Sequence, residues 1–68
     1  MVRYIIYIKK GKEKEKIYFG SDNYKIVTEE YITLHNKILK NKTHIEISLY
    51  DFHKNLYLKV NTNYGTNK

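Results

Sequence analysis

The sequence contains no cysteine, proline or tryptophan, and only three of its 68 residues are glycine. Without cysteine the chain cannot form disulfides or thiolate metal sites, so its stability must come from packing or from association. It also lacks an apolar run near the roughly 20 residues that span a bilayer. The longest run, residues 4–8, has the length of a strand, so we expect no membrane segment.

Apolar side chains are scarce as well. They make up 41% of the chain and include eight tyrosines, so tyrosine must supply part of the core. A chain of 68 residues corresponds to one small domain. We expect residues 1–61 to form this α+β domain and the polar residues 62–68 to form a flexible tail. The strand-like start of the chain lacks the features of a signal peptide, which favours a cytoplasmic location.

Charge of one sign dominates the sequence. Thirteen lysines and arginines stand against seven acidic residues, for a formal net charge of +6. Such a balance favours nucleic acid as a partner. Isoleucine, lysine, asparagine and tyrosine, which all have AT-rich codons, are abundant. This composition indicates a low-GC genome, such as that of a bacterium, its phages and plasmids, or a virus acting in the host cytoplasm.

Alternation of apolar and polar residues predicts four strands, at residues 2–10, 16–20, 44–50 and 56–61. Two of these strands precede a segment with helical periodicity and two follow it. The order β-β-α-β-β predicts an α+β fold, in which one helix packs on one face of a four-stranded, mostly antiparallel sheet.

The helix is predicted at residues 28–40, because Tyr31, Leu34 and Ile38 share one helical face. Thr28 is suited to cap its N-terminus, with two glutamates in the first turn. A hydrophobic staple would join the residues on either side of this cap, Val27 and Ile32. Residues 24–27 either extend the second strand or lead into the helix, and Asn41 can cap the C-terminus.

One alternating set of strand side chains must face the helix. Within the whole core we expect Ile6, Leu34, Ile38, Ile47 and Leu58 to be among the most buried residues. The strand residues expected on this face are Val2, Tyr4, Ile6, Ile8, Ile17, Phe19, Ile45, Ile47, Leu49, Leu56, Leu58 and Val60.

The other set, which includes Glu46 and Ser48, must face away from the helix, and it combines four tyrosines with four cations. Tyrosines surrounded by cations could stack on bases and hold a phosphate backbone. The same face could instead pack against another protein, or it could be ordinary cross-strand packing in water. The candidate partner- or nucleic-acid-binding residues are Arg3, Ile5, Tyr7, Lys9, Lys16, Tyr18, Tyr50, Tyr57 and Lys59.

Two further basic segments are candidates for phosphate contact. One is the end of the helix, with Lys37, Lys40 and Lys42, and the other is the charged connection at residues 9–16. Lysines at a helix C-terminus also compensate the helix dipole, and charged loop tips prevent edge pairing between sheets. Both segments therefore have a purely structural explanation.

No combination of residues points to catalysis. His35, His44 and His53 lack a metal-ligand spacing, and neither Ser21 nor Ser48 lies in a nucleophile motif. The three glycines are isolated and form no phosphate loop. We therefore expect no enzyme activity, no metal site and no cofactor.

The sequence thus predicts a small non-enzymatic binding protein that acts through a larger protein or nucleoprotein partner. An inhibitor or adaptor encoded by a phage or mobile element, acting on a host complex, fits this size and composition. The alternative is a basic nucleic-acid-binding module that uses the sheet face rich in tyrosine and lysine. A homodimer is also expected, because a small sheet leaves two edges and one face uncovered.

Overall fold

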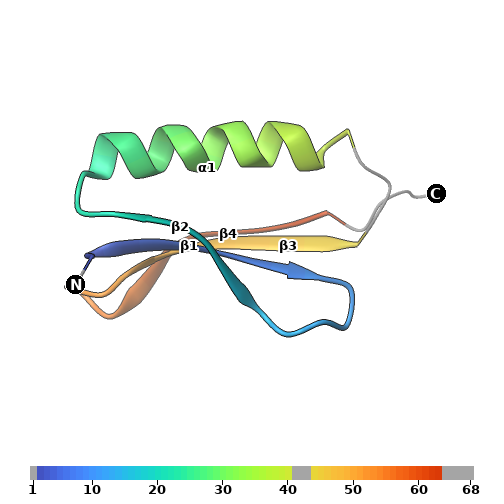
Figure 1. Ribbon diagram of the computed structural model, residues 1–68, viewed down its shortest axis with the longest axis horizontal. Helices are drawn as coiled ribbons and strands as arrows, with labels where there is room; N and C mark the ends of the chain where they lie inside the picture. Colours follow the sequence, from blue (N-terminus) through green and yellow to red (C-terminus); the bar gives the residue numbers. More distant parts are fainter. Residues whose placement is uncertain (1, 41–43, 64–68) are drawn as a thin grey trace.

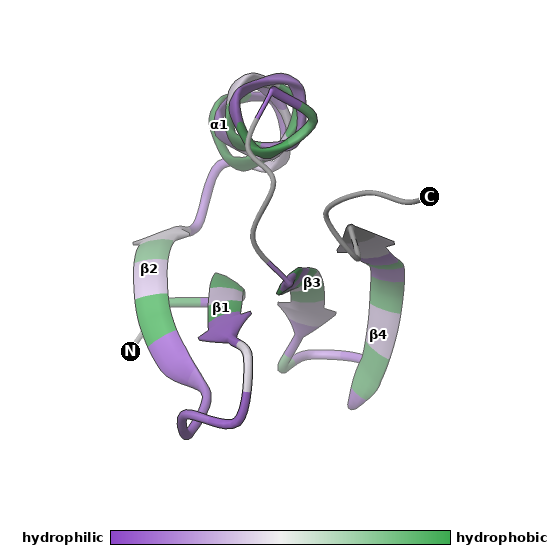
Figure 2. Ribbon diagram, turned by 90° about the vertical axis from the view of Figure 1, so that its right-hand side faces the viewer, coloured by the Kyte–Doolittle hydropathy of each residue, from purple (hydrophilic) through white to green (hydrophobic). Residues whose placement is uncertain are grey.

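The computed structural model describes residues 2–40 and 44–63. Its elements are β1 (Tyr4–Lys10), β2 (Lys16–Ser21), α1 (Tyr24–Ile38), β3 (Ile45–Asp51) and β4 (Leu56–Asn63). The strands form one sheet in the order β2-β1-β3-β4, and α1 lies across one face of it (Figures 1 and 2). The predicted α+β fold and element order are therefore confirmed.

All three strand pairings are antiparallel. Because β1 is antiparallel to both of its neighbours, β2 and β3 run in the same direction on either side of it. Two strands that run in the same direction need a long crossover connection. Helix α1 is this connection, and it covers the face that it crosses (Figure 1).

The core lies between α1 and the two inner strands, β1 and β3. Four of the five residues expected to be most buried are in it, while Leu58 is partly buried and packs against its edge. The helix contributes side chains spaced by three and four positions, as one face of an amphipathic helix must. The buried apolar residues are Tyr4, Ile6, Val27, Tyr31, Leu34, Ile38, Ile45, Ile47 and Leu49.

Helix α1 begins four residues earlier than the sequence predicts. Asn23 is its N-cap, since the Asn23 side chain accepts a hydrogen bond from the Ile26 amide at 3.1 Å. Thr28 lies inside the helix, where its hydroxyl lies 2.8 Å from the Tyr24 carbonyl oxygen. The predicted staple is also wrong, because Val27 is buried while Ile32 is 55% exposed. The helix ends at Ile38, and the predicted cap Asn41 lies outside the described residues.

Tyr31 joins the helix to two strands. Its hydroxyl donates a hydrogen bond to Asn61 Oδ1 at 2.6 Å and lies 3.3 Å from the Ile47 carbonyl oxygen. Burial raises the pKa of Tyr31 to about 12. A tyrosine thus supplies core volume and a polar tether at once, as expected for a chain poor in aliphatic residues.

Two β-bulges reverse the expected direction of side chains in the outer strands. In β2, Phe19 pairs with Ile6 but Ile17 pairs with Tyr7, so Tyr18 is the extra residue. In β4, Leu58 is the extra residue between Tyr57 and Lys59, which pair with Tyr50 and Leu49 respectively. An extra residue shifts the alternation by one, so positions beyond it point to the opposite face.

The core prediction is therefore wrong for Ile17 and Val60, and Leu56 is also exposed although it pairs with Asp51 on the side of α1. Ile17 is 66% exposed, Val60 is 55% exposed and Leu56 is 44% exposed. Ile17 and Val60 instead lie on the uncovered side of the sheet, because they pair with Tyr7 and Ser48. Strand β4 also continues to Asn63, past the expected end at Asn61.

Candidate functional site

The sheet face opposite α1 carries an aromatic and aliphatic cluster, which we call the open face. Tyr50 is at its centre, with its ring centroid 4.6 Å from that of Phe52 and 4.8 Å from that of Tyr57, both in edge-to-face geometry. Edge-to-face rings of this kind stabilise one another beyond their buried area. The strand register and these ring contacts define the open face as Ile5, Tyr7, Ile17, Ser48, Tyr50, Phe52, Tyr57 and Val60.

Ser48 forms the floor of the open face. It pairs with Tyr7 on one side and Val60 on the other, and it is only 4% exposed. Within the described residues its hydroxyl has no hydrogen-bond partner. A small residue here lets the larger side chains around it close over the sheet, while several of those neighbours stay accessible. Tyr57, for example, is 52% exposed.

The electrostatic environment of the open face differs from the sequence expectation. The pKa of Tyr57 is raised, mainly by the negative charge of Glu15. Burial and the nearby Tyr7, Tyr50 and Glu46 contribute smaller effects in the same direction. Lys9 is the candidate cation that the register leaves on this side of the sheet, and it pairs there with Glu46. The open face is therefore not the basic surface that was predicted.

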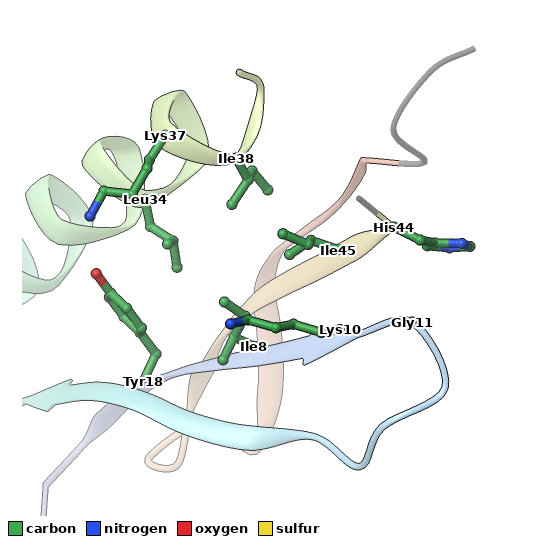
Figure 3. Close-up of a pocket in the computed structure, with 9 residues that line it drawn as sticks. All are labelled: Ile8, Lys10, Gly11, Tyr18, Leu34, Lys37, Ile38, His44 and Ile45. Carbon is green, nitrogen blue, oxygen red and sulfur yellow. The ribbon is translucent and has the colours of Figure 1, made fainter. Parts of the chain in front are cut away.

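The β-bulges in β2 and β4 explain why the predicted cations Lys16 and Lys59 are absent from the open face. Lys16 pairs with Ile8, and Lys59 pairs with Leu49, so both lysines lie on the side of α1. Tyr18, the extra residue in β2, also lies on that side, where its ring rises toward α1 (Figure 3). The predicted facing is thus correct for Ile5, Tyr7, Lys9, Tyr50 and Tyr57, and wrong for Lys16, Tyr18 and Lys59.

Arg3 is held by an ion pair rather than free on the open face. Its Nε and Nη2 donate to the two carboxylate oxygens of Asp51 at 3.1 and 3.2 Å. The Asp51 carboxylate also accepts the His53 amide at 2.8 Å. These bonds, mainly the one from Arg3, lower the pKa of Asp51 to about 2. Arg3 therefore fastens the start of β1 to the β3–β4 turn.

A groove lies on the opposite side of the sheet, between the C-terminal half of α1 and strands β1 and β2. It encloses about 580 Å³, and its apolar floor is formed by Ile8, Leu34, Ile38 and Ile45. Lys10, Lys37, Tyr18 and His44 supply its polar side chains (Figure 3). At one end the Gly11 amide donates to the His44 carbonyl oxygen at 2.7 Å, which joins the β1–β2 hairpin to β3.

Sequence reasoning missed several residues of these surfaces. Phe52 lies between the strands predicted at residues 44–50 and 56–61, and Ile17 and Val60 were expected in the core, yet all three belong to the open face. The acidic residue Asp51, which also lies between those predicted strands, is 1% exposed and organises two elements. An aspartate before a turn typically accepts hydrogen bonds from the backbone amides that follow it, but nothing in the sequence indicated that Asp51 pairs with Arg3.

The described residues hold no group of three or more histidine, cysteine, aspartate or glutamate side chains that could bind a metal ion. Within the same residues, the one helix is too short and too polar to cross a membrane. Comparisons with family models, with curated proteins and with solved structures found no match to this chain.

Proposed function

We propose that this protein is a non-enzymatic binding protein whose open face docks on an apolar patch of a larger, acidic protein. The observation that carries this proposal is that Ile17, Tyr57 and Val60 are exposed on one face of the sheet, beside the partly buried Tyr7 and Tyr50. Clustered tyrosines with aliphatic neighbours are typical of the centres of protein interfaces.

Charge distinguishes the possible occupants of this face. Glu15 and Glu46 act on Tyr57, and these carboxylates would repel a phosphate backbone. A second copy of the chain would bring together two molecules that each carry +6, whereas an acidic partner is attracted to the whole molecule. A nucleic acid carries a phosphate at every nucleotide, whereas an acidic protein can place an apolar patch on the open face and direct its carboxylates to lysines elsewhere on the molecule. An acidic protein therefore suits this surface better than nucleic acid or self-association.

The expected biological role follows from size. A chain of 68 residues that covers an apolar patch on its partner can block that patch, as an inhibitor does, or can join the partner to another macromolecule, as an adaptor does. An inhibitor or adaptor carried by a phage or mobile element of a low-GC host is the role that we propose.

Affinity purification followed by binding of purified proteins tests the proposal. The tagged protein is incubated with nuclease-treated lysate of a low-GC bacterium, and an acidic captured protein is then purified and titrated calorimetrically. We expect Tyr57→Ala to weaken this direct binding by about 30-fold or more, as at an interface hot spot. Tyr18→Ala is the matched control, since Tyr18 is 40% exposed but lies on the other side of the sheet.

The outcomes separate the alternatives. Capture that nuclease abolishes, or direct binding that Tyr57→Ala leaves unchanged, would overturn the proposal. A tight dimer that forms at low micromolar concentration and low salt without any partner, and that is lost in Tyr57→Ala, would assign the open face to a second copy of the chain.

A further inference from the structure

Two basic segments that are far apart in the sequence meet on the helix side of the sheet. Lys10 comes from the end of β1, and Lys37 comes from the last turn of α1, yet both line the groove described above. A second hollow shares Ile8, Lys10 and Tyr18 with this groove and adds Lys14 and Lys16. Together they form one continuous basic surface, which we call the basic groove.

The Tyr18 ring lies in the wall of the basic groove. The bulge in β2 turns this side chain away from the open face, so its hydroxyl end approaches the helix near Leu34 and Lys37 (Figure 3). The ring remains 40% exposed. A planar aromatic face is thus available beside an apolar floor, with lysines on both sides.

The charge of the basic groove is strongly positive. Lys10, Lys14, Lys16 and Lys37 line it, and Glu13 is the acidic residue among the described lining. Glu13 is directed to one of these lysines, with 3.9 Å between Glu13 Oε1 and Lys16 Nζ. The other lysine ammonium groups can therefore meet an anionic ligand without competition from this carboxylate.

We infer that the basic groove binds single-stranded nucleic acid, with a base stacked on Tyr18 and the neighbouring phosphates held by Lys10, Lys14 and Lys37. An aromatic platform combined with a groove of cations is how proteins bind single strands without sequence preference. The two adjoining hollows extend beyond one phosphate, which suits a strand better than a free nucleotide. An acidic peptide would satisfy the lysines but would leave the Tyr18 ring and the apolar floor without a planar partner.

Tyr18 and Lys37 lie on the opposite side of the sheet from the open face, although Ile17 of the open face also lines the second hollow. The two sites can therefore be tested with different variants. Fluorescence anisotropy with a labelled oligothymidylate of 12 nucleotides measures binding to the basic groove directly, over a series of salt concentrations. We expect Tyr18→Ala to weaken binding by about 5- to 150-fold at every salt concentration. Tyr18→Phe, which keeps the ring, should retain binding.

A charge variant with a matched control tests the phosphate contacts. Lys37→Gln should lower the slope of log K against log salt by about 0.7, as expected when one phosphate contact to a single strand is lost. Lys25→Gln removes the same charge from the first turn of α1, about 18 Å away along the helix. It should leave the slope unchanged.

Several results would overturn the inference. One is the absence of binding at low salt, and another is equal binding by wild type and Tyr18→Ala. Equal loss in Lys25→Gln and Lys37→Gln would show attraction to the whole charged molecule instead of a site. Polyglutamate and thymidine monophosphate are each compared with unlabelled oligothymidylate as competitors. If polyglutamate competes as well, the groove binds acidic peptides, and if thymidine monophosphate competes as well, it binds free nucleotides. Tyr57→Ala should bind the oligonucleotide normally, so failure of this inference and failure of the proposed function are distinguishable.

Discussion

Asp51 shows how one side chain can join two distant segments of this protein. Its carboxylate is 1% exposed, yet Arg3 and the amides of the following turn satisfy it. A buried carboxylate is tolerated only when it is paired and hydrogen-bonded in this way. The same bonds that fasten β1 to the β3–β4 turn also set the charge state of Asp51.

The stability of the protein should therefore fall in acid. Because the pKa of Asp51 is about 2 in the folded protein and 3.8 ordinarily, its contribution is complete above about pH 4. It is lost as the pH falls toward 2, since the unfolded chain takes up this proton more readily. Urea unfolding between pH 2 and 7 should show this loss in the wild type and a smaller one in Asp51→Asn. Arg3→Gln should also reduce it, and an unchanged pH dependence in both variants would contradict the assignment.

Ser48 differs from Asp51, because its buried hydroxyl has no hydrogen-bond partner within the described residues. We therefore expect its removal to cost no stability. Ser48→Ala should leave the free energy of unfolding unchanged or raise it by up to about 1 kcal/mol. Ser21→Ala is the comparison, since the Ser21 hydroxyl accepts the Asn23 amide at 3.0 Å. It should lower the free energy of unfolding by roughly 0.5–1.5 kcal/mol. Denaturant titration measures both, and a large loss in Ser48→Ala would mean that the hydroxyl is bonded.

At the scale of elements, the helix and the strands differ in how far their sequence predicts them. Periodicity located the buried stripe of α1 but not its first turn, which precedes the cap predicted at Thr28. Thr28 is a good cap by type and precedes two glutamates. Asn23 is the actual cap, since Ser21 and Asp22 hold the preceding turn through hydrogen bonds to Asn23 and Arg3.

Paired substitutions distinguish the two caps. Asn23→Ala should lower the free energy of unfolding by about 0.5–2 kcal/mol, the usual cost of losing an N-cap. Thr28→Ala should change it by no more than about 0.5 kcal/mol, because alanine is the better helix former at an interior position. Thermal unfolding followed by circular dichroism measures both, and a larger loss in Thr28→Ala would favour the later helix start.

The bulges in β2 and β4 had the largest effect on the candidate sites. Neither Tyr18 nor Leu58 is a glycine or has a turn former beside it, so no local signal marks a bulge in either strand. Each bulge follows from fitting an outer strand to an inner one whose side chains are already placed in the core. The positions of Lys16, Lys59, Ile17 and Val60 all depend on this fit.

For the whole molecule, the consequence is a separation of Tyr7, Tyr50 and Tyr57 from most of the lysines. The sequence predicted one surface that combined both, and the structure has an aromatic open face on one side and a basic groove on the other. Two ligands of different chemistry can then be bound at the same time. A partner protein on the open face would leave Tyr18 and Lys37 of the basic groove free.

Self-association tests the open face at this scale. We expect a weak homodimer at high micromolar concentration that strengthens as salt rises, because salt screens the repulsion between two +6 chains. Val60→Lys should abolish the dimer by placing a charge on the open face. Leu39→Lys is the control, because Leu39 is the C-cap of α1 and is 59% exposed on the other side of the sheet. Light scattering that finds only monomer at every salt concentration would contradict this prediction.

The sequence by itself determined the order of elements, the α+β fold and most of the core. These depend on local periodicity, which can be read within a single segment. The helical spacing of Tyr31, Leu34 and Ile38 is one example, and the alternation of Ile45, Ile47 and Leu49 is another. Tertiary structure alone decided which face the side chains of the outer strands occupy and what partner Arg3 has. The reason is that strand register and the pairing of Arg3 with Asp51 join residues that are distant in the chain. Their geometry is settled by packing against β1 and β3, and no local pattern encodes it.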